Sequence, residues 1–255
     1  MQDLKPMSLQ SSILFFGIPA ILVTIQMYIV MGLFANSGLP IFWNYTLIYA
    51  TIPMFLLIIA SLVFFRREGN SLSWSVLKQR FRLQRMNKND WLWVLGLFLL
   101  MFITAGVLSV VTSPVIAEVF PPPAYWPDEL NPLESSPSAE IPSEFLGEPL
   151  AGNWWILLVV LSSLVIATLG EELWWRGYIL PRQELTHGKN TWIIHGILWG
   201  LFHIFHPWNL LVLLPGSLAL SYVVQKRENT WVAIIAHALV NGFLVISMIS
   251  MGIIG

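Results

Sequence analysis

Residues 154–177 read WWILLVVLSSLVIATLGEELWWRG, an apolar run that ends in three ionisable side chains. The run contains no charged residue up to Leu169, and Glu171, Glu172 and Arg176 follow it directly. An ionised side chain at the centre of a bilayer costs about 2.5–3.5 kcal/mol on insertion scales. Charges at this position therefore predict a functional site within or beside a membrane.

The composition of the whole chain indicates a membrane protein. Of 255 residues, 56% are hydrophobic and only 11% are charged, with a mean hydropathy of +0.70. A soluble domain carries about 25% charged residues. The net charge of −1 gives no sign of nucleic-acid binding. The absence of cysteine excludes disulfides, thiol nucleophiles and cysteine-ligated zinc or iron–sulfur sites.

Seven apolar segments are candidate membrane spans, because about 20 apolar residues cross a bilayer as a helix. Their hydrophobicity is continuous and not alternating, which predicts helices. The fifth and sixth segments are short, so we expect them to form a tight hairpin or to be shielded by other helices. The predicted fold class is all-α, a polytopic transmembrane helical bundle of about seven spans around a polar cavity. The segments are 12–34, 41–65, 91–117, 153–180, 191–206, 208–226 and 230–254.

The charges of the two longest loops predict the orientation. Loop 66–90 holds seven basic and two acidic residues, a net charge of +5, whereas loop 118–150 holds seven acidic residues and no Lys or Arg. By the positive-inside rule the first loop is cytoplasmic, and the second is then extracytoplasmic. The N-terminus is predicted to be cytoplasmic. We expect two regions, three spans over residues 1–150 and four spans over residues 151–255.

The composition of each long loop predicts its local structure. Residues 74–88 mix apolar and basic side chains, which is typical of either a cationic amphipathic helix on the anionic inner leaflet or a solvated basic loop. Residues 119–150 are rich in Pro, Ser and Glu, which favours an extended and poorly ordered loop. A lid over the outer face is the less favoured alternative.

The two adjacent carboxylates are expected to have different partners. Glu172 and Arg176 lie four residues apart, so they share a helix face and can form an ion pair. Glu171 lies about 100° around the helix and can face another group. Because two neighbouring carboxylates at low dielectric resist being ionised together, an arginine on one leaves the other with an environment of its own. The structural alternative is a helix end at the interface, with Arg176 reaching to water.

Two further segments carry polar residues at helical spacing. In the fifth, His195, Trp199 and His203 form one i, i+4 stripe beside two glycines that allow a neighbouring helix to approach. In the seventh, His237 and Asn241 are again four residues apart. Counted at about 1.5 Å per residue from the predicted cytoplasmic ends, their depths are compatible with those of the carboxylates. We expect these residues to converge, whereas each alone could be a hydrogen-bonded packing residue.

Such a set can hydrolyse a peptide bond. A carboxylate and a histidine can share a water, remove its proton and direct the hydroxide at a carbonyl. A second histidine and an amide NH₂ can donate to the oxyanion that develops, each donor being worth about 3–4 kcal/mol. No covalent intermediate is needed, but the buried site must admit water.

Three motifs, in this order on separate segments, resemble those of the CAAX-protease and bacteriocin-processing family, also called the Abi family of intramembrane glutamic endopeptidases. The motifs are Glu-Glu-x-x-Trp-Arg-Gly at 171–177, Trp-x-x-x-His at 199–203 and His-x-x-x-Asn at 237–241. The similarity covers about residues 150–245. It implies a helical bundle whose cavity opens towards the cytosol.

The resemblance also implies a role for each motif residue. Glu171 would be the base that activates water and His203 its partner, while His237 and Asn241 would form the oxyanion site. The supporting residues would be Glu172, Arg176 and Trp199, the last of which keeps the aromatic character of its position.

Two alternatives remain open at this point. Glu171, His203 and His237 could bind Zn²⁺ with water as the fourth ligand, although the chain has no H-E-x-x-H motif. The polar residues could instead hold helices together in a bacteriocin-immunity or scaffold protein. The resemblance implies no cofactor and no metal. The expected partners are the lipid bilayer of a prokaryotic inner or plasma membrane and a membrane-associated peptide or protein substrate, prenylated or bacteriocin-like, with no nucleic acid. The sequence indicates neither the physiological substrate nor the oligomeric state.

Overall fold

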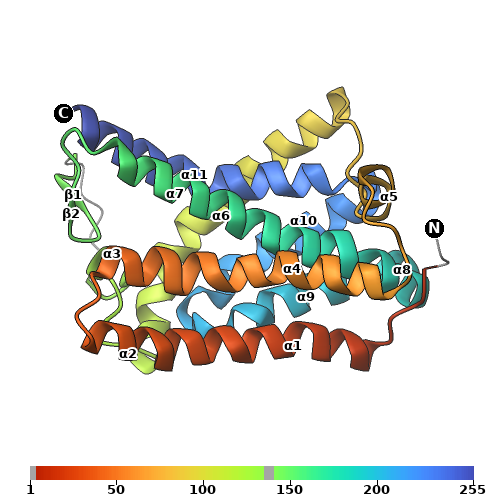
Figure 1. Ribbon diagram of the computed structural model, residues 1–255, viewed down its shortest axis with the longest axis horizontal. Coiled ribbons are helices and arrows are strands. Elements are labelled where there is room, and N and C mark those ends of the chain that lie inside the picture. Colours follow the sequence, from red (N-terminus) through yellow and green to blue (C-terminus); the bar gives the residue numbers. More distant parts are fainter. Residues whose placement is uncertain (1–3, 135–140) are drawn as a thin grey trace.

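The computed structural model describes residues 4–134 and 141–255 as a bundle of long helices, so the all-α fold class is confirmed. The first and last described residues lie at opposite ends of its long axis (Figure 1). The elements are α1 (Leu9–Ile25), η1 (Gln26–Val30), α2 (Met31–Asn36), α3 (Ile41–Trp43), η2 (Asn44–Thr51), α4 (Ile52–Arg67), α5 (Trp74–Arg80), α6 (Lys88–Val119), η3 (Asp128–Leu130), β1 (Glu144–Phe145), β2 (Glu148–Pro149), α7 (Trp154–Glu172), η4 (Leu173–Ile179), α8 (Leu180–His187), η5 (Gly188–Asn190), α9 (Thr191–Phe202), η6 (His203–Phe205), η7 (Pro207–Asn209), α10 (Leu210–Arg227) and α11 (Thr230–Ile254).

Within the described residues, six helical segments are long and apolar enough to cross a membrane. One of them, Trp154–Phe205, covers 52 residues and contains two of the predicted spans, 153–180 and 191–206, on either side of the turn η5. The described residues therefore contain six candidate spans where the sequence predicted about seven, because the predicted spans 153–180 and 191–206 belong to one continuous helical segment. The six segments indicate an integral membrane protein.

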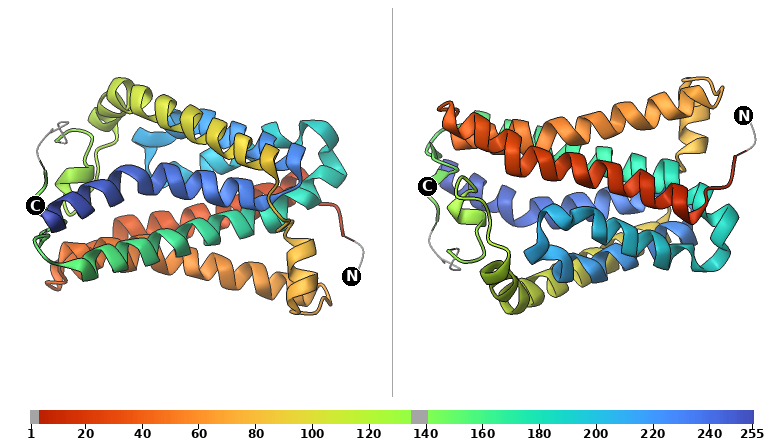
Figure 2. Two further views of the ribbon diagram at one scale, coloured as in Figure 1. Left: turned by 90° about the horizontal axis from the view of Figure 1, so that it is seen from above. Right: turned by 90° about the horizontal axis from the view of Figure 1, so that it is seen from below.

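Helix α9 is too short to cross a bilayer by itself. Its 12 residues extend about 18 Å, against about 30 Å of hydrocarbon. It turns through η6 and η7 into α10, so the predicted hairpin is present, and this turn stops short of the end that carries β1 and β2 (Figures 1 and 2). A Cβ on Gly196 would lie 2.9 Å from the Cα of Leu218. Helix α10 therefore packs directly on α9, as the glycine spacing predicts.

The basic loop 66–90 lies at one end of the bundle, and the described parts of the acidic loop lie at the other (Figure 1). Helix α5 is short, and the chain beyond it enters the bundle. Arg80 is 5% exposed and donates to two carbonyl oxygens of η4, 3.1 and 3.2 Å away. Phe81 is 2% exposed and belongs to the main core. Both sequence alternatives for residues 74–88, a surface helix and a solvated loop, are therefore wrong for Arg80, Phe81 and Leu83, which are buried.

The acidic loop also packs against the bundle. Trp126 is 4% exposed and contacts Tyr49 edge-on, with ring centroids 5.1 Å apart. Strands β1 and β2 pair as an antiparallel hairpin, and Leu146 between them is buried in a second core with Ile253. The expectation of a poorly ordered loop is wrong for these parts, because they bury large apolar side chains. Residues 135–140 of the loop lie outside the described residues.

Close packing holds the end of α7 in the interior. A Cβ on Gly170 would overlap the carbonyl oxygen of Met54, so α4 and α7 approach each other as only glycine permits. Helix α7 then continues as the π-helical stretch η4, a geometry that often marks functional sites. Glu171 and Glu172 lie at this junction with 8% and 0% of their surface exposed.

Candidate active site

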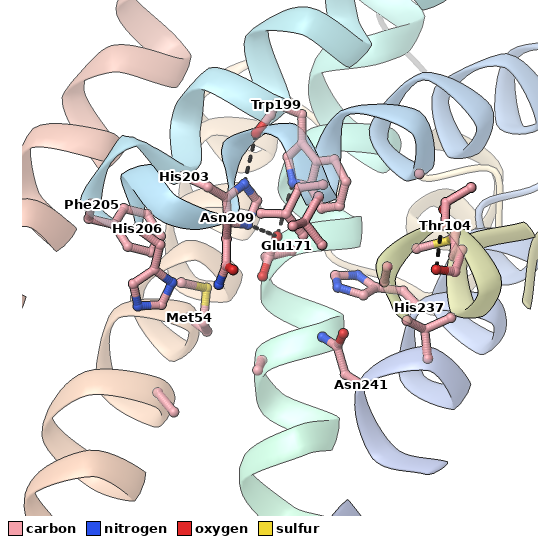
Figure 3. Close-up of a pocket in the computed structure, with 18 of the residues that line it drawn as sticks. Met54, Thr104, Glu171, Trp199, His203, Phe205, His206, Asn209, His237 and Asn241 are labelled. Carbon is pink, nitrogen blue, oxygen red and sulfur yellow. Dashed lines mark hydrogen bonds and ion pairs between the residues drawn. The ribbon is translucent and has the colours of Figure 1, made fainter. Parts of the chain in front are cut away.

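One cavity of about 240 Å³ lies within the bundle, and all four residues predicted to be catalytic line it. Glu171 comes from α7, His203 from the start of η6, and His237 and Asn241 from α11. Figure 3 shows the four side chains around one space, with Glu171 between the two histidines. The convergence expected from sequence depth is therefore present. Helices α4, α6 and α10 contribute mostly apolar walls.

Two side-chain nitrogens lie close to the same carboxylate oxygen of Glu171. Its Oε2 accepts a hydrogen bond from Trp199 Nε1 at 3.0 Å, and His203 Nε2 lies 3.7 Å from the same atom. An indole is a donor only, so this contact orients the carboxylate without supplying a countercharge. The position of the Glu171 carboxylate is therefore fixed by a neutral neighbour.

The ring of His203 is held by the backbone one turn earlier. Its Nδ1 lies 2.9 Å from the carbonyl oxygen of Trp199. A carbonyl oxygen only accepts, so this contact assigns the hydrogen to Nδ1. In the neutral ring Nε2 then carries the lone pair and faces Glu171 (Figure 3). His203 is the first residue of η6, directly after α9 ends at Phe202.

Glu172 anchors a buried ionic network. Its Oε1 accepts from Arg176 Nη1 at 3.0 Å and from His237 Nδ1 at 2.8 Å, and Glu172 and Arg176 are both 0% exposed. The predicted pairing of Glu172 with Arg176 is present. The contact with His237 joins α7 to α11 and directs the Nε2 side of that ring towards the cavity.

Trp199 lies at the centre of the site, although the sequence indicated only a supporting role for this residue. The Arg176 guanidinium lies over its ring, 3.9 Å from the centroid. The rings of His203 and His237 contact it edge-on at 5.0 and 5.5 Å. A single indole thus contacts Arg176, both histidines and, through Nε1, Glu171. The spacing of Trp199 and His203 was the available signal for this role.

Sequence reasoning missed part of the cavity wall. Tyr49, His206 and Asn209 also line the cavity. Tyr49 Oη and His206 Nε2 lie 2.9 Å apart. Tyr49 comes from the first half of the chain, which carries no motif, so no sequence signal pointed to it. His206 lies in the turn between α9 and α10.

His195 is not part of this cavity. It is fully buried, and its Nδ1 lies 2.6 Å from Gln183 Oε1. This arrangement fits a packing role. Within residues 4–134 and 141–255, no group of three His, Asp or Glu side chains is placed to hold a metal ion.

Comparison with protein families matches residues 153–243 to the family described as type II CAAX prenyl endopeptidase Rce1-like. This region contains the three motifs, so the resemblance that they carry is confirmed for it, and the match supports a membrane-protease activity at the level of the family. Among curated proteins the chain is similar to UPF0177 protein YxdF of Lactococcus lactis subsp. lactis (strain IL1403), with 35% identity over 79 residues. That match covers 31% of this chain and 44% of YxdF, so the chain spans less than half the length of this relative. No solved structure matches the chain.

Proposed function

We propose that this protein is an intramembrane endopeptidase that cleaves a membrane-associated peptide with water activated by Glu171 and His203. One observation carries the proposal: Glu171 Oε2 and His203 Nε2 lie 3.7 Å apart in a cavity that His237 and Asn241 also line. The family match over residues 153–243 supports the same class of reaction.

Glu171 is the general base in this proposal. A water at hydrogen-bond distance, about 2.6–3.2 Å, from both Glu171 and His203 occupies the apex of a triangle above their 3.7 Å separation. Glu171 removes its proton, and His203 aligns the remaining lone pair with the scissile carbonyl. The protonated carboxyl can later deliver that proton to the leaving amine. The indole of Trp199 fixes the carboxylate through the 3.0 Å hydrogen bond.

His237 and Asn241 stabilise the oxyanion. Glu172 accepts from His237 Nδ1 at 2.8 Å and compensates the charge of a ring that is protonated on both nitrogens, so that Nε2–H can donate. The side-chain NH₂ of Asn241 supplies a second donor from the same helix, one turn further along. One such donor is typically worth about 3–4 kcal/mol in rate.

The substrate class follows from the location and the walls of the cavity. An apolar lining around a few polar groups suits a hydrophobic or lipid-modified peptide segment, such as a prenylated or bacteriocin-like peptide. We place the protein in a prokaryotic inner or plasma membrane with its N-terminus in the cytoplasm. The separation of the basic and acidic loops onto opposite ends of the bundle supports this orientation.

The proposal is tested by comparing the membrane peptides of cells that express wild-type or Glu171→Gln protein at equal levels. We expect peptides with new termini only with the wild type. Identical peptide profiles from the two cell lines would contradict the proposal. If Glu171→Gln protein also protects cells as the wild type does, the non-enzymatic immunity or scaffold alternative is favoured.

A further inference from the structure

A second cavity lies on the membrane-facing surface, apart from the catalytic one. It is an apolar groove of about 400 Å³ between α1 and α4, and Trp174 of η4 contributes to its wall. Leu14, Leu22 and Leu56 line it and are each more than half exposed. No residue lines both this groove and the catalytic cavity. Figures 1 and 2 show α1 and α4 running alongside each other over this length.

A cationic pocket of about 410 Å³ lies where this groove reaches the N-terminal end of α1. Lys5, Arg67 and Arg182 line it together with Glu68, three cations against one carboxylate, so its net charge is +2. Glu68 is already engaged by Arg182 and Tyr178, at 3.0 and 2.6 Å. The ammonium of Lys5 and the guanidinium of Arg67 are exposed and pair with no carboxylate in the described part of the chain.

The groove and the pocket adjoin each other. Phe15 and Phe64 line both, and their rings touch edge-on with centroids 5.4 Å apart. An apolar groove therefore lies next to a cationic pocket at the end of the bundle that carries the basic loop. The apolar groove matches the acyl chain of an anionic lipid, and the cationic pocket at the membrane surface matches its negatively charged headgroup.

We propose that this groove and pocket form a binding site for one anionic glycerophospholipid. Its phosphate lies among Lys5, Arg67 and Arg182, and one acyl chain lies along the groove between α1 and α4. A zwitterionic lipid fills the groove equally well but carries no net charge to complement the pocket, so the headgroup decides the preference. The site differs from the proposed catalytic centre and does not depend on its activity.

The test uses the full chain purified in a mild detergent and native mass spectrometry of bound lipid. Titration with phosphatidylglycerol and with phosphatidylcholine of the same acyl chains should show one lipid bound, with phosphatidylglycerol preferred. The double variant Lys5→Gln/Arg67→Gln removes the two unpaired cations and should weaken phosphatidylglycerol binding about 30-fold. The matched control Arg85→Gln/Lys189→Gln removes two exposed cations outside the pocket and should leave binding within about twofold.

A third variant tests the acyl chain. Ala60→Phe fills the groove without changing a charge and should also reduce phosphatidylglycerol binding. Glycerophosphoglycerol, which lacks acyl chains, should fail to displace the bound lipid. Equal binding of the two lipids by the wild type, equal losses in the two double variants, wild-type binding by Ala60→Phe, or displacement by glycerophosphoglycerol would each overturn the proposal.

Discussion

Replacing each adjacent carboxylate by its amide should separate folding from chemistry. Oε1 of Glu172 holds both Arg176 and His237, and Glu172 is 0% exposed. Glu172→Gln leaves the Arg176 charge buried without a counter-ion, and removing one partner of such a pair costs about 3–5 kcal/mol. Glu171 faces the cavity, and an amide oxygen can still accept from Trp199. Glu171→Gln should therefore cost less than about 1 kcal/mol of stability.

The assay combines thermal unfolding in detergent, followed by tryptophan fluorescence, with peptide cleavage well below both transitions. One kcal/mol corresponds to about 2–4 °C in a chain of this size, so Glu172→Gln should lower Tm by about 10 °C and Glu171→Gln by less than about 4 °C. Glu171→Gln should lower cleavage by about 10²–10⁴-fold, as expected for loss of a general base. A wild-type Tm for Glu172→Gln, or equal destabilisation by both changes, would refute this division of roles.

Three further predictions follow from single contacts. Trp199→Phe removes the hydrogen bond to Glu171, worth about 1.5–3 kcal/mol, and should lower kcat at least about tenfold. Trp175→Phe is its control, because that buried indole N–H has no hydrogen-bond partner among the residues that the structure describes, and equal losses in both variants would point to packing instead. Gly170→Ala should destabilise the protein by about 1–3 kcal/mol, as overpacking does, whereas Gly106→Ala, whose Cβ meets open space, should leave Tm unchanged. A wild-type Tm for Gly170→Ala would contradict this, because it would show that α4 and α7 can move apart enough for a methyl group without losing stability. Exhaustive chelation should leave cleavage unchanged, and a loss restored by Zn²⁺ would support the metal alternative.

Features within one segment were predictable from the sequence. The spans follow from hydrophobicity, because a helix in lipid satisfies its own backbone whatever lies beside it. The pairing of Glu172 with Arg176 follows from helical spacing, because residues four apart share a face. The three motifs predicted four of the polar side chains that line one cavity, since residues at compatible depths on packed helices can meet.

Contacts between segments were harder to predict when no motif marked them. The docking of Arg80 on η4 and the packing of Trp126 on Tyr49 depend on how loops fold back over the bundle. Their composition was that of exposed loops, and it gave no sign of burial. Tyr49 of η2 lines the cavity, although no motif in its own segment marks it.

The sequence by itself determined that this is a helical membrane protein and that Glu171 and Glu172 have separate partners. Only the tertiary structure decided which partners on other helices they have. Glu172 binds His237, 65 residues away, as well as Arg176, and Glu171 is oriented by the indole of Trp199. The physical reason is that helical spacing acts within one helix, whereas these contacts join different helices. Helical spacing fixes a side chain's direction relative to its own axis, whereas a hydrogen bond between helices requires their rotation and depth to be correct within about half an ångström.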